Sequence, residues 1–434
     1  MQNSLRGISN KAKRLKDYRF GNLYTMLNEE NLLDSWQYIK KYAASGVDKV
    51  SAQEFEQDLP NHVASLVERL KRKGYRAKLV RRHYIPKGKG KYRPLGIPAT
   101  IDKLLQKAVA RILAAIYEQD FLPCSFGYRA GIGAKTGVEE LSYQLQFGWF
   151  GYVVEADIKG FFDHINHDWL IAMLSQRIND RPFLWLIRKW LKAGILDTDG
   201  KVIHPVSGTP QGGIVSPLLA NIYLHYVLDL WFEKVIKPKC KGSVYLSRYA
   251  DDFVVLFQYK READLFYREL PKRLGKFGLE VAQDKTQILS FSKFRMQENS
   301  RFDFVGFEFR WGYSRRRKPI IKKRTSRHKL HNSIVGLTKW CREHRDNPLW
   351  KIFKDMNAKL RGYYNYYGVI GNSQSLQEFF YHVKRILFKW LNRRSERRSY
   401  NWNGFNALMK HFGLLKPRIR QQRNYQLNLQ KALC

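Results

Sequence analysis

The stretch "LSRYADDFVVLF" (residues 246–257) places two neighbouring carboxylates, Asp251 and Asp252, between apolar runs. Side chains of adjacent residues on a strand point to opposite faces, so one of the two acids has to face an interior or a cleft. A carboxylate in such apolar surroundings is costly unless a cation meets it. The stretch therefore predicts a site where a strand presents acids to a cation.

A third acid lies upstream, in the segment "VVEADIKGFFDHI" (residues 153–165). Asp157 follows an apolar strand there and occupies the turn into a helix, 94 residues before Asp251, so only the fold can unite the two. Three carboxylates on adjacent strand ends can hold two Mg²⁺ ions roughly 3.5–4 Å apart. In such a site one ion activates an attacking 3′-hydroxyl, and the other binds the nucleotide phosphates and the leaving pyrophosphate.

The charge balance indicates a polyanionic partner. The 434 residues include 78 Lys and Arg against 38 Asp and Glu, a formal net charge of +40 that is far more than solubility requires. Nucleic acid is the leading candidate, because aromatic residues form 14% of the chain and can stack on bases. A membrane surface is the alternative. We expect no membrane partner, since no apolar run approaches the length of a spanning helix and no signal-peptide pattern opens the chain.

Cysteine and histidine spacing argues against a zinc module. The chain has four cysteines, far apart and without a CxxC pair: Cys124, Cys240, Cys341 and Cys434. This usage is typical of the reducing cytosol, so we expect a cytoplasmic protein without a disulfide-linked partner. His164 and His167 form an HxxH pair that lacks two further zinc ligands, and a surface helix is the favoured interpretation.

Periodicity divides the chain into three regions. Residues 1–80 read as helices, including one over "QEFEQDLPNHVASLVERLKRKGY" (residues 53–75) that closes at Gly74. Residues 81–310 mix helices with strands rich in β-branched and aromatic residues. Residues 311–434 begin with a basic run and continue as helices. The pattern predicts an α+β fold with a helical C-terminal domain.

The segments taken together resemble the reverse transcriptase family, and more narrowly the reverse transcriptase–maturases encoded by bacterial group II introns. The resemblance covers nearly the whole chain. The segments that carry it are "YIPKGKGKYRPLGIPATIDKLLQKAV" (84–109), "SFGYRAGIGAKTGVEEL" (125–141), "ADIKGFFDHI" (156–165), "TPQGGIVSPLLANI" (209–222), "RYADD" (248–252), "GLEVAQDKTQIL" (278–289) and "FVGFEF" (304–309). It implies a right-hand polymerase with N-terminal fingers, a palm with an antiparallel sheet, and a helical C-terminal thumb or maturase (X) domain.

The resemblance also assigns residues to the chemistry. Asp157, Asp251 and Asp252 would be the catalytic carboxylates that hold two Mg²⁺ ions, and the Ile158 carbonyl would add a metal ligand. Lys285 would be an acid for the leaving pyrophosphate, although an ordinary exposed lysine is the simpler interpretation. Lys87 and Arg93 would clamp the incoming triphosphate from the fingers, and Gln211 would touch the templating pair from the minor-groove side. The deoxynucleotide site would also include Gly160, Phe161 and Phe162.

Phe162 lies five residues after Asp157. In the family, an aromatic residue at this spacing sits beneath the sugar and excludes a 2′-hydroxyl, whereas related viral RNA-dependent RNA polymerases commonly carry an acid there. Phe161 is equally apolar, so one of the two belongs to the core. The spacing favours Phe162 as the gate.

The C-terminal half carries the features expected to hold primer and RNA. Val305, Gly306 and Phe307 would form the primer grip, although a core hairpin is the alternative. Basic runs flank the polymerase region, and the cluster Arg315, Arg316 and Arg317 is expected to bind a folded RNA through its phosphates or to grip the template–primer duplex. The segment "GYYNYYG" (residues 362–368) could stack on nucleic acid or pack within a thumb helix.

The expected function is RNA-directed DNA synthesis together with assistance to the splicing and mobility of a group II intron. The expected partners are group II intron RNA or another RNA template, a DNA primer or target, and dNTP. Two alternatives stay open: a splicing-only RNA-binding maturase, and a domesticated reverse transcriptase in host defence or repair. The chain reaches Cys434 without the histidines and CxxC pairs of a C-terminal endonuclease, so self-supplied second-strand nicking is not expected.

Overall fold

The computed structural model describes residues 4–88, 90–297, 299–394 and 399–420. The chain divides into two compact units. The first unit consists of residues 1–133 and 156–288, and the second of residues 134–155 and 289–434. The two units therefore interleave along the chain.

The first unit begins with helices, as predicted. They are α1 (Leu5–Arg14), α2 (Glu29–Trp36), α3 (Ala52–Gln57), α4 (Leu59–Lys71) and α5 (Thr100–Tyr117). The single helix predicted over residues 53–75 is wrong, because the chain breaks at Asp58 into α3 and α4. Pro60 explains the break: proline suits the first turn of a helix but removes a hydrogen bond and clashes in a helix interior.

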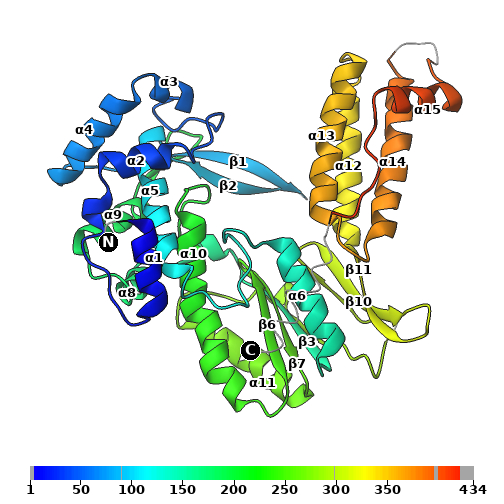
Figure 1. The fold of residues 1–434 in the computed structure, drawn as a ribbon, viewed down its shortest axis with the longest axis horizontal. Helices are drawn as coiled ribbons and strands as arrows, with labels where there is room; N and C mark the ends of the chain where they lie inside the picture. The colour runs from blue at the N-terminus through cyan, green and yellow to red at the C-terminus, as the bar shows by residue number, and fades with distance from the viewer. Residues whose placement is uncertain (1–3, 89, 298, 395–398, 421–434) are drawn as a thin grey trace. The chain divides into compact units, whose positions relative to one another are not determined.

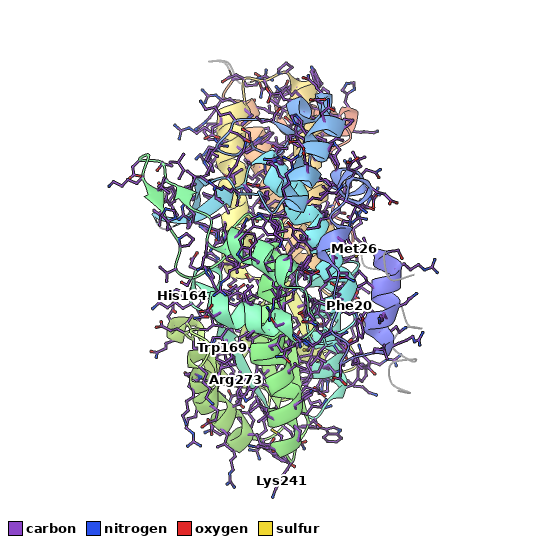
Figure 2. All side chains as sticks on the ribbon, turned by 90° about the vertical axis from the view of Figure 1, so that its left-hand side faces the viewer. Phe20, Met26, His164, Trp169, Lys241 and Arg273 are labelled. Carbon is purple, nitrogen blue, oxygen red and sulfur yellow. The ribbon has the colours of Figure 1, made fainter. Side chains whose placement is uncertain are left out.

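One buried arginine ties the N-terminal segment to the rest of the first unit. The Arg177 guanidinium donates to Asp120 Oδ2 at 2.8 Å and to the Leu15 and Tyr18 carbonyls at 3.0 and 2.8 Å. A cation is favourable at these carbonyls because they follow the C-terminus of α1. The backbone N–H of Phe20, a buried residue labelled in Figure 2, donates to the Arg177 carbonyl at 2.7 Å.

The remaining elements of the first unit are strands and the helices that support them. The strands are β1 (Val80–Gly88), β2 (Lys91–Ile97), β4 (Ile195–Leu196), β5 (Val202–Ile203), β6 (Val244–Tyr249) and β7 (Asp252–Phe257). The helices are α7 (Phe161–His164), α8 (His167–Ser175), α9 (Arg181–Leu191), α10 (Ser216–Leu224) and α11 (Lys260–Gly275). Strands β1 and β2 form an antiparallel hairpin in a sheet of order β2-β1-β4-β5.

A second sheet has the order β6-β7-β3-β8, where β3 is Tyr152–Asp157 and β8 is Gln287–Ser290. The stretch around Asp251 is an antiparallel hairpin of β6 and β7 (Figure 1). Residues 253–257 of β7 are fully buried, which explains their unbroken apolar run. Helix α11 packs on this strand through Phe266, whose ring centroid lies 5.4 Å from that of Phe257.

Helix α10 continues into two π-helical turns, η2 (His225–Asp229) and η3 (Phe232–Ile236). Arg273 supports this wider segment by donating to the Val227 and Tyr226 carbonyls at 2.8 and 3.0 Å. Its guanidinium also lies 4.6 Å from the ring centroid of Phe277, which packs against Trp169. Trp169 and Arg273 are labelled in Figure 2. The π-helical turns carry Asp229, a fully buried acid.

The second unit combines a small sheet with a helical bundle. Its elements are α6 (Ala134–Phe147), β9 (Arg301–Phe304), β10 (Phe307–Tyr313), β11 (Pro319–Thr325), α12 (Arg327–His344), α13 (Leu349–Tyr367), α14 (Ser373–Leu391) and α15 (Trp402–His411). The sheet has the order β11-β10-β9. Helices α12, α13 and α14 lie side by side (Figure 1) and bury a common apolar core. The sequence correctly predicts helices over α13 and α14.

The tyrosines of the 362–368 segment mainly pack. Tyr364 is 2% exposed, and the Tyr363 ring stacks on Phe379 with centroids 3.8 Å apart. Tyr366 is 39% exposed, and its hydroxyl donates to the Val305 carbonyl at 3.0 Å. Of the two interpretations of this segment, packing within the helical domain therefore describes these tyrosines better than stacking on nucleic acid.

Buried His225 is expected to make the fold acid-sensitive. Burial lowers its pKa to about 4, and its Nδ1 has no hydrogen-bond partner among the described residues. The unfolded chain takes up this proton near pH 6.5, so the contribution to stability is lost as pH falls from about 6.5 to 4. The loss amounts to about 3 kcal/mol.

We predict that His225→Phe flattens this part of the pH dependence, measured as the free energy of unfolding in urea at pH 4 to 7. The ring can still pack edge-on against Phe121. His331→Gln, at an exposed histidine, is the control and should keep the wild-type slope. An unchanged slope in His225→Phe would contradict the assignment.

Candidate active site

The turn between β6 and β7 carries the acid pair in an unusual backbone conformation. Tyr249 and Asp252 are the last paired residues, so Ala250 and Asp251 form a two-residue turn. Ala250 has φ +57°, a left-handed conformation that is uncommon for residues other than glycine. The backbone of Gly127 packs directly on the turn, because a Cβ there would lie 2.6 Å from the Ala250 nitrogen. Surrounding structure therefore fixes the position of Asp251.

Arg248 is the centre of that surrounding structure. It is fully buried, and all five of its N–H groups have partners. Nε and Nη2 donate to the two carboxylate oxygens of Asp229 at 2.7 and 2.6 Å. Nη2 also donates to Ser125 Oγ at 2.8 Å, while Nη1 donates to Asn221 Oδ1 and to the Ala250 carbonyl, both at 3.1 Å.

The network extends from the turn to two neighbouring segments. The Asn221 side chain donates to the Gly127 carbonyl at 2.6 Å, and the Arg248 main chain pairs with Cys124 and Phe126 at 2.8 and 2.9 Å. Helix α10, residues 124–127 and the β6–β7 turn are thus locked together through Arg248. A satisfied buried network of this kind specifies one arrangement of its segments.

The third acid ends strand β3. Ile158 forms an isolated antiparallel bridge with Val281, made by the Ala282 N–H donating to the Asp157 carbonyl at 2.8 Å and the Lys159 N–H donating to the Glu280 carbonyl at 2.9 Å. Neither of these bonds uses the Ile158 carbonyl. The carboxylate of Asp157 forms an ion pair with the ammonium group of Lys285.

Electrostatics links these groups. Burial raises the pKa of Asp251, the charge of Asp157 raises it further, and Arg93 and Lys285 oppose the shift. The hydrogen bond to Asp157 raises the pKa of Lys285. Two carboxylates that repel each other and attract an ammonium group form a hard, anionic oxygen donor set, which suits a divalent cation such as Mg²⁺.

Among the described residues, no three His, Cys, Asp or Glu side chains already converge on one metal position. Asp252, the first residue of β7, is partly exposed. The HxxH pair does not form a metal site either. His164 Nδ1 lies 2.9 Å from the Gly160 carbonyl, and His167 Nε2 lies 2.7 Å from the Gly208 carbonyl. His167 is 5% exposed, so the surface-helix interpretation is wrong for this residue.

The turn after Asp157 separates the two phenylalanines. Gly160 has φ +54° and precedes α7. Phe161 is 2% exposed and packs near Tyr223. This residue therefore belongs to the core, and its expected contact with a nucleotide is wrong. Phe162 is half-buried, and its carbonyl accepts a hydrogen bond from the Thr209 N–H at 2.8 Å.

The Gly-rich loop lies against the same turn. Gln211 Nε2 is 3.4 Å from Asp163 Oδ1, and the Gln211 carbonyl accepts from the Gly96 N–H of β2 at 2.5 Å. Gly212 has φ +115°, and a Cβ there would lie 2.6 Å from the Gly96 carbonyl oxygen. Close backbone approach therefore joins the loop to the β1–β2 hairpin.

The two predicted triphosphate residues come from that hairpin. Arg93 is exposed on β2, opposite Ile85, and its charge acts on Asp251. Lys87 belongs to β1, but its side chain lies outside the described residues.

The predicted primer-grip and RNA residues belong to the second unit. Val305 and Gly306 have φ +51° and +77° and form the tight turn between β9 and β10, while Phe307 is fully buried. Arg315, Arg316 and Arg317 are exposed at the tip of the β10–β11 hairpin.

Three neighbours of the acids escaped the sequence analysis: Asp229, Asn221 and Tyr128. Asp229 had a usable signal, because a lone acid in the apolar helix "HYVLDLWF" (residues 225–232) requires a buried partner. Tyr128 had none, since its φ of +55° and its direction are known only from the fold.

Comparison with known proteins identifies the class. The family model for reverse transcriptase (RNA-dependent DNA polymerase) matches residues 85–309, more than half of the chain. The chain belongs to the reverse transcriptase family. Its α+β architecture, antiparallel β6–β7 hairpin and helical C-terminal region confirm the predicted right-hand polymerase fold.

A second family model indicates which branch of the reverse transcriptases the chain resembles. Residues 335–407 match the maturase-specific domain of group II introns. The group II intron-encoded protein LtrA of Lactococcus lactis subsp. cremoris is 31% identical, over 74% of this chain and 65% of that protein. Protein YkfC of Escherichia coli is 29% identical, over 71% of this chain and 84% of that protein. Telomerase from Candida albicans overlaps with a TM-score of 0.45 at 14% identity, covering 83% of this chain and 68% of that one.

The chain thus spans 65% of the length of its lactococcal relative, and its resemblance to group II intron-encoded proteins is supported at both the polymerase and the maturase segments. Among the described helices, none is long and apolar enough to cross a membrane.

The Arg248–Asp229 pair yields a stability prediction. We expect Asp229→Asn to lower the free energy of unfolding by about 3–5 kcal/mol, because it leaves a buried guanidinium without its counter-charge. Urea unfolding followed by circular dichroism measures the change. Glu269→Gln, which breaks the exposed pair with Lys272, is the matched control and should have little effect.

Replacing both partners, as in Asp229→Leu with Arg248→Met, should cost less than Asp229→Asn alone. Equal stability of Asp229→Asn and the surface control would show that the pair does not hold the turn.

Proposed function

We propose that the protein is an RNA-directed DNA polymerase that copies RNA into cDNA by nucleotidyl transfer at two Mg²⁺ ions. The observation that carries the proposal is that the segment matching the reverse transcriptase family holds Asp251 on a turn fixed by Arg248 and pairs Asp157 with Lys285. A protein that only binds RNA has no need of this arrangement. The substrates would be an RNA template, a DNA primer and dNTP.

Asp157, Asp251 and Asp252 would hold the metal ions, with the Ile158 carbonyl as a further ligand. When bound, the ions would activate the primer 3′-hydroxyl and neutralise charge on the leaving pyrophosphate. The Arg248 network keeps the Asp251 turn in place, so little reorganisation is needed when substrates bind. Lys285 carries a raised pKa and stays cationic, which suits a donor to the pyrophosphate oxygens.

The remaining residues would bind the nucleotide. Arg93, together with Lys87, would contact the triphosphate, because guanidinium and ammonium groups match phosphate oxygens. Gln211 would contact the base pair, and the Gly160 turn would bring backbone close to the nucleotide. Phe162 would be the sugar gate, with its aromatic ring in the space that a 2′-hydroxyl requires.

We predict that Asp251→Asn abolishes Mg²⁺-dependent extension of a DNA primer on an RNA template, because it removes an anionic metal ligand while preserving shape. Losses of roughly 10²–10³-fold in kcat are expected when one group that stabilises charge is removed. RNA binding, measured by filter retention, should change little. Asp264→Asn, at an exposed acid of α11, is the control and should extend normally. Wild-type extension by Asp251→Asn would refute the metal assignment.

We further propose that the protein binds a group II intron RNA and assists its splicing and mobility in the bacterial cytoplasm. The match to the maturase-specific domain over residues 335–407 supports this role. The charge excess supports it too, because a net charge of +40 exceeds the needs of one duplex-binding cleft. Val305, Gly306 and Phe307 would form the primer grip, and the exposed arginines at the β10–β11 tip would contact intron phosphates.

Neutralising Arg315, Arg316 and Arg317 together to Gln should weaken binding to a cognate intron RNA and lower the slope of log Kd against log salt by about 2–3. Primer extension on an unrelated short template should change much less. The control is the exposed basic triplet Lys71, Arg72 and Lys73, changed in the same way.

Equal losses in intron binding and primer extension would show that the three arginines grip the template–primer duplex. Equal losses in the two triplet variants would show that total charge matters, and would remove the special role of the β10–β11 tip.

A further inference from the structure

Tyr128 is held in a strained conformation next to the proposed sugar gate. Its φ of +55° lies in the left-handed region, where a tyrosine is unfavourable and a glycine is not. Its side chain is nevertheless 50% exposed, so burial of the ring does not explain why a tyrosine stands there. Strain of this kind is found at functional sites, where the surrounding contacts hold the backbone in an unfavourable conformation.

Both neighbours of Tyr128 are fixed by side chains. The Gly127 carbonyl accepts from Asn221 Nδ2 at 2.6 Å, and the Gly127 backbone packs on Ala250. The Arg129 guanidinium donates to Glu118 Oε2 at 2.9 Å and to the Ser125 carbonyl at 2.8 Å. Tyr128 therefore has little freedom to leave its conformation, and the direction of its ring is set by the fold.

The ring lies among groups of the proposed active site. It meets Phe162 edge to face, with centroids 6.4 Å apart and planes at 85°. The centroid of the Tyr249 ring, at the end of β6 next to the β6–β7 turn, lies 6.5 Å from that of Tyr128. Burial raises the pKa of the Tyr128 phenol, and the charges of Asp251 and Tyr249 add to the shift while Arg93 opposes it. The Tyr128 ring thus contacts Phe162 and Tyr249 and lies close enough to Asp251 to feel its charge.

We propose that Tyr128 is a positioning residue for sugar discrimination, which holds the Phe162 ring in the orientation that excludes a 2′-hydroxyl. The inference rests on the proposed function, in which Phe162 is the gate. An aromatic ring can turn about its side-chain torsions, and half-buried Phe162 has the buried Phe161 ring edge-on with centroids 5.6 Å apart, so a second fixed ring confines it to one orientation. The edge-to-face contact supplies that neighbour, and the strained backbone of residue 128 is explained by the need to aim the ring.

The test measures the ratio of kcat/KM for a deoxynucleotide to that for the matching ribonucleotide. Tyr128→Gly removes the ring and relieves the backbone, so the fold should be retained. Discrimination against the ribonucleotide should fall about two- to tenfold, the range expected for loss of one aromatic pair, while kcat with the deoxynucleotide changes little. Tyr128→Phe should keep the wild-type ratio. Tyr42→Gly, at a 91% exposed tyrosine, is the matched control and should also keep it.

The Phe162→Ala background separates the two claims. If Tyr128 acts through Phe162, Tyr128→Gly will not relax discrimination further once Phe162 is gone. Additive effects would show that Tyr128 meets the sugar itself, which contradicts a positioning role. If Phe162→Ala relaxes sugar discrimination but Tyr128→Gly keeps the wild-type ratio, the inference about Tyr128 is overturned, while Phe162 remains the gate. If Phe162→Ala keeps the wild-type ratio, Phe162 is not the sugar gate, and the inference about Tyr128 is overturned with it.

Tyr128→Asn provides a second variant, because asparagine tolerates the left-handed region without an aromatic ring. It should relax discrimination as Tyr128→Gly does. Wild-type ratios in both variants would overturn the inference. Loss of synthesis with both sugars in both variants would overturn it as well, since the support of a gate is not needed for the chemistry.

Discussion

The buried ion pair between Arg248 and Asp229 is the interaction on which the acid-bearing turn depends. Both side chains are fully buried, so each is costly without the other. Arg248 recovers the cost through five satisfied N–H groups, one of which reaches the Ala250 carbonyl. A hydrophobic pair could supply similar stability but could not hold that carbonyl. The network therefore specifies where the turn lies, and with it Asp251.

The proposed chemistry follows from segments that converge around this anchor. Strand β3 delivers Asp157, and the Gly-rich loop is bonded to both the Phe162 carbonyl and β2. Each junction uses a close backbone approach or a left-handed residue, as at Gly212 and Ala250. The charges of Arg93 and Lys285 act on Asp251, whose pKa is raised by burial and by the charge of Asp157.

The sequence predicted the parts that local pattern and spacing encode. The helical N-terminal region, the C-terminal helices and the strand before Asp157 follow from periodicity. The break at Asp58 was missed because apolar spacing outweighed the signal of Pro60. Spacing favoured Phe162 over Phe161 as the gate, and the structure buries Phe161 and leaves Phe162 half-buried. The partner of Arg248 and the role of Tyr128 depend on contacts between distant segments, which one sequence does not reveal.

The central claim is that Asp157 and Asp251 share a divalent metal site. The most direct measurement is anomalous diffraction from crystals of the protein soaked with Mn²⁺ and bound to a template–primer and a non-hydrolysable dNTP. The account predicts two anomalous peaks roughly 3.5–4 Å apart, both within coordination distance of these two carboxylates. It also predicts that Lys285 no longer pairs with Asp157 there. The absence of a peak at these acids, with the nucleotide visibly bound, would contradict the account.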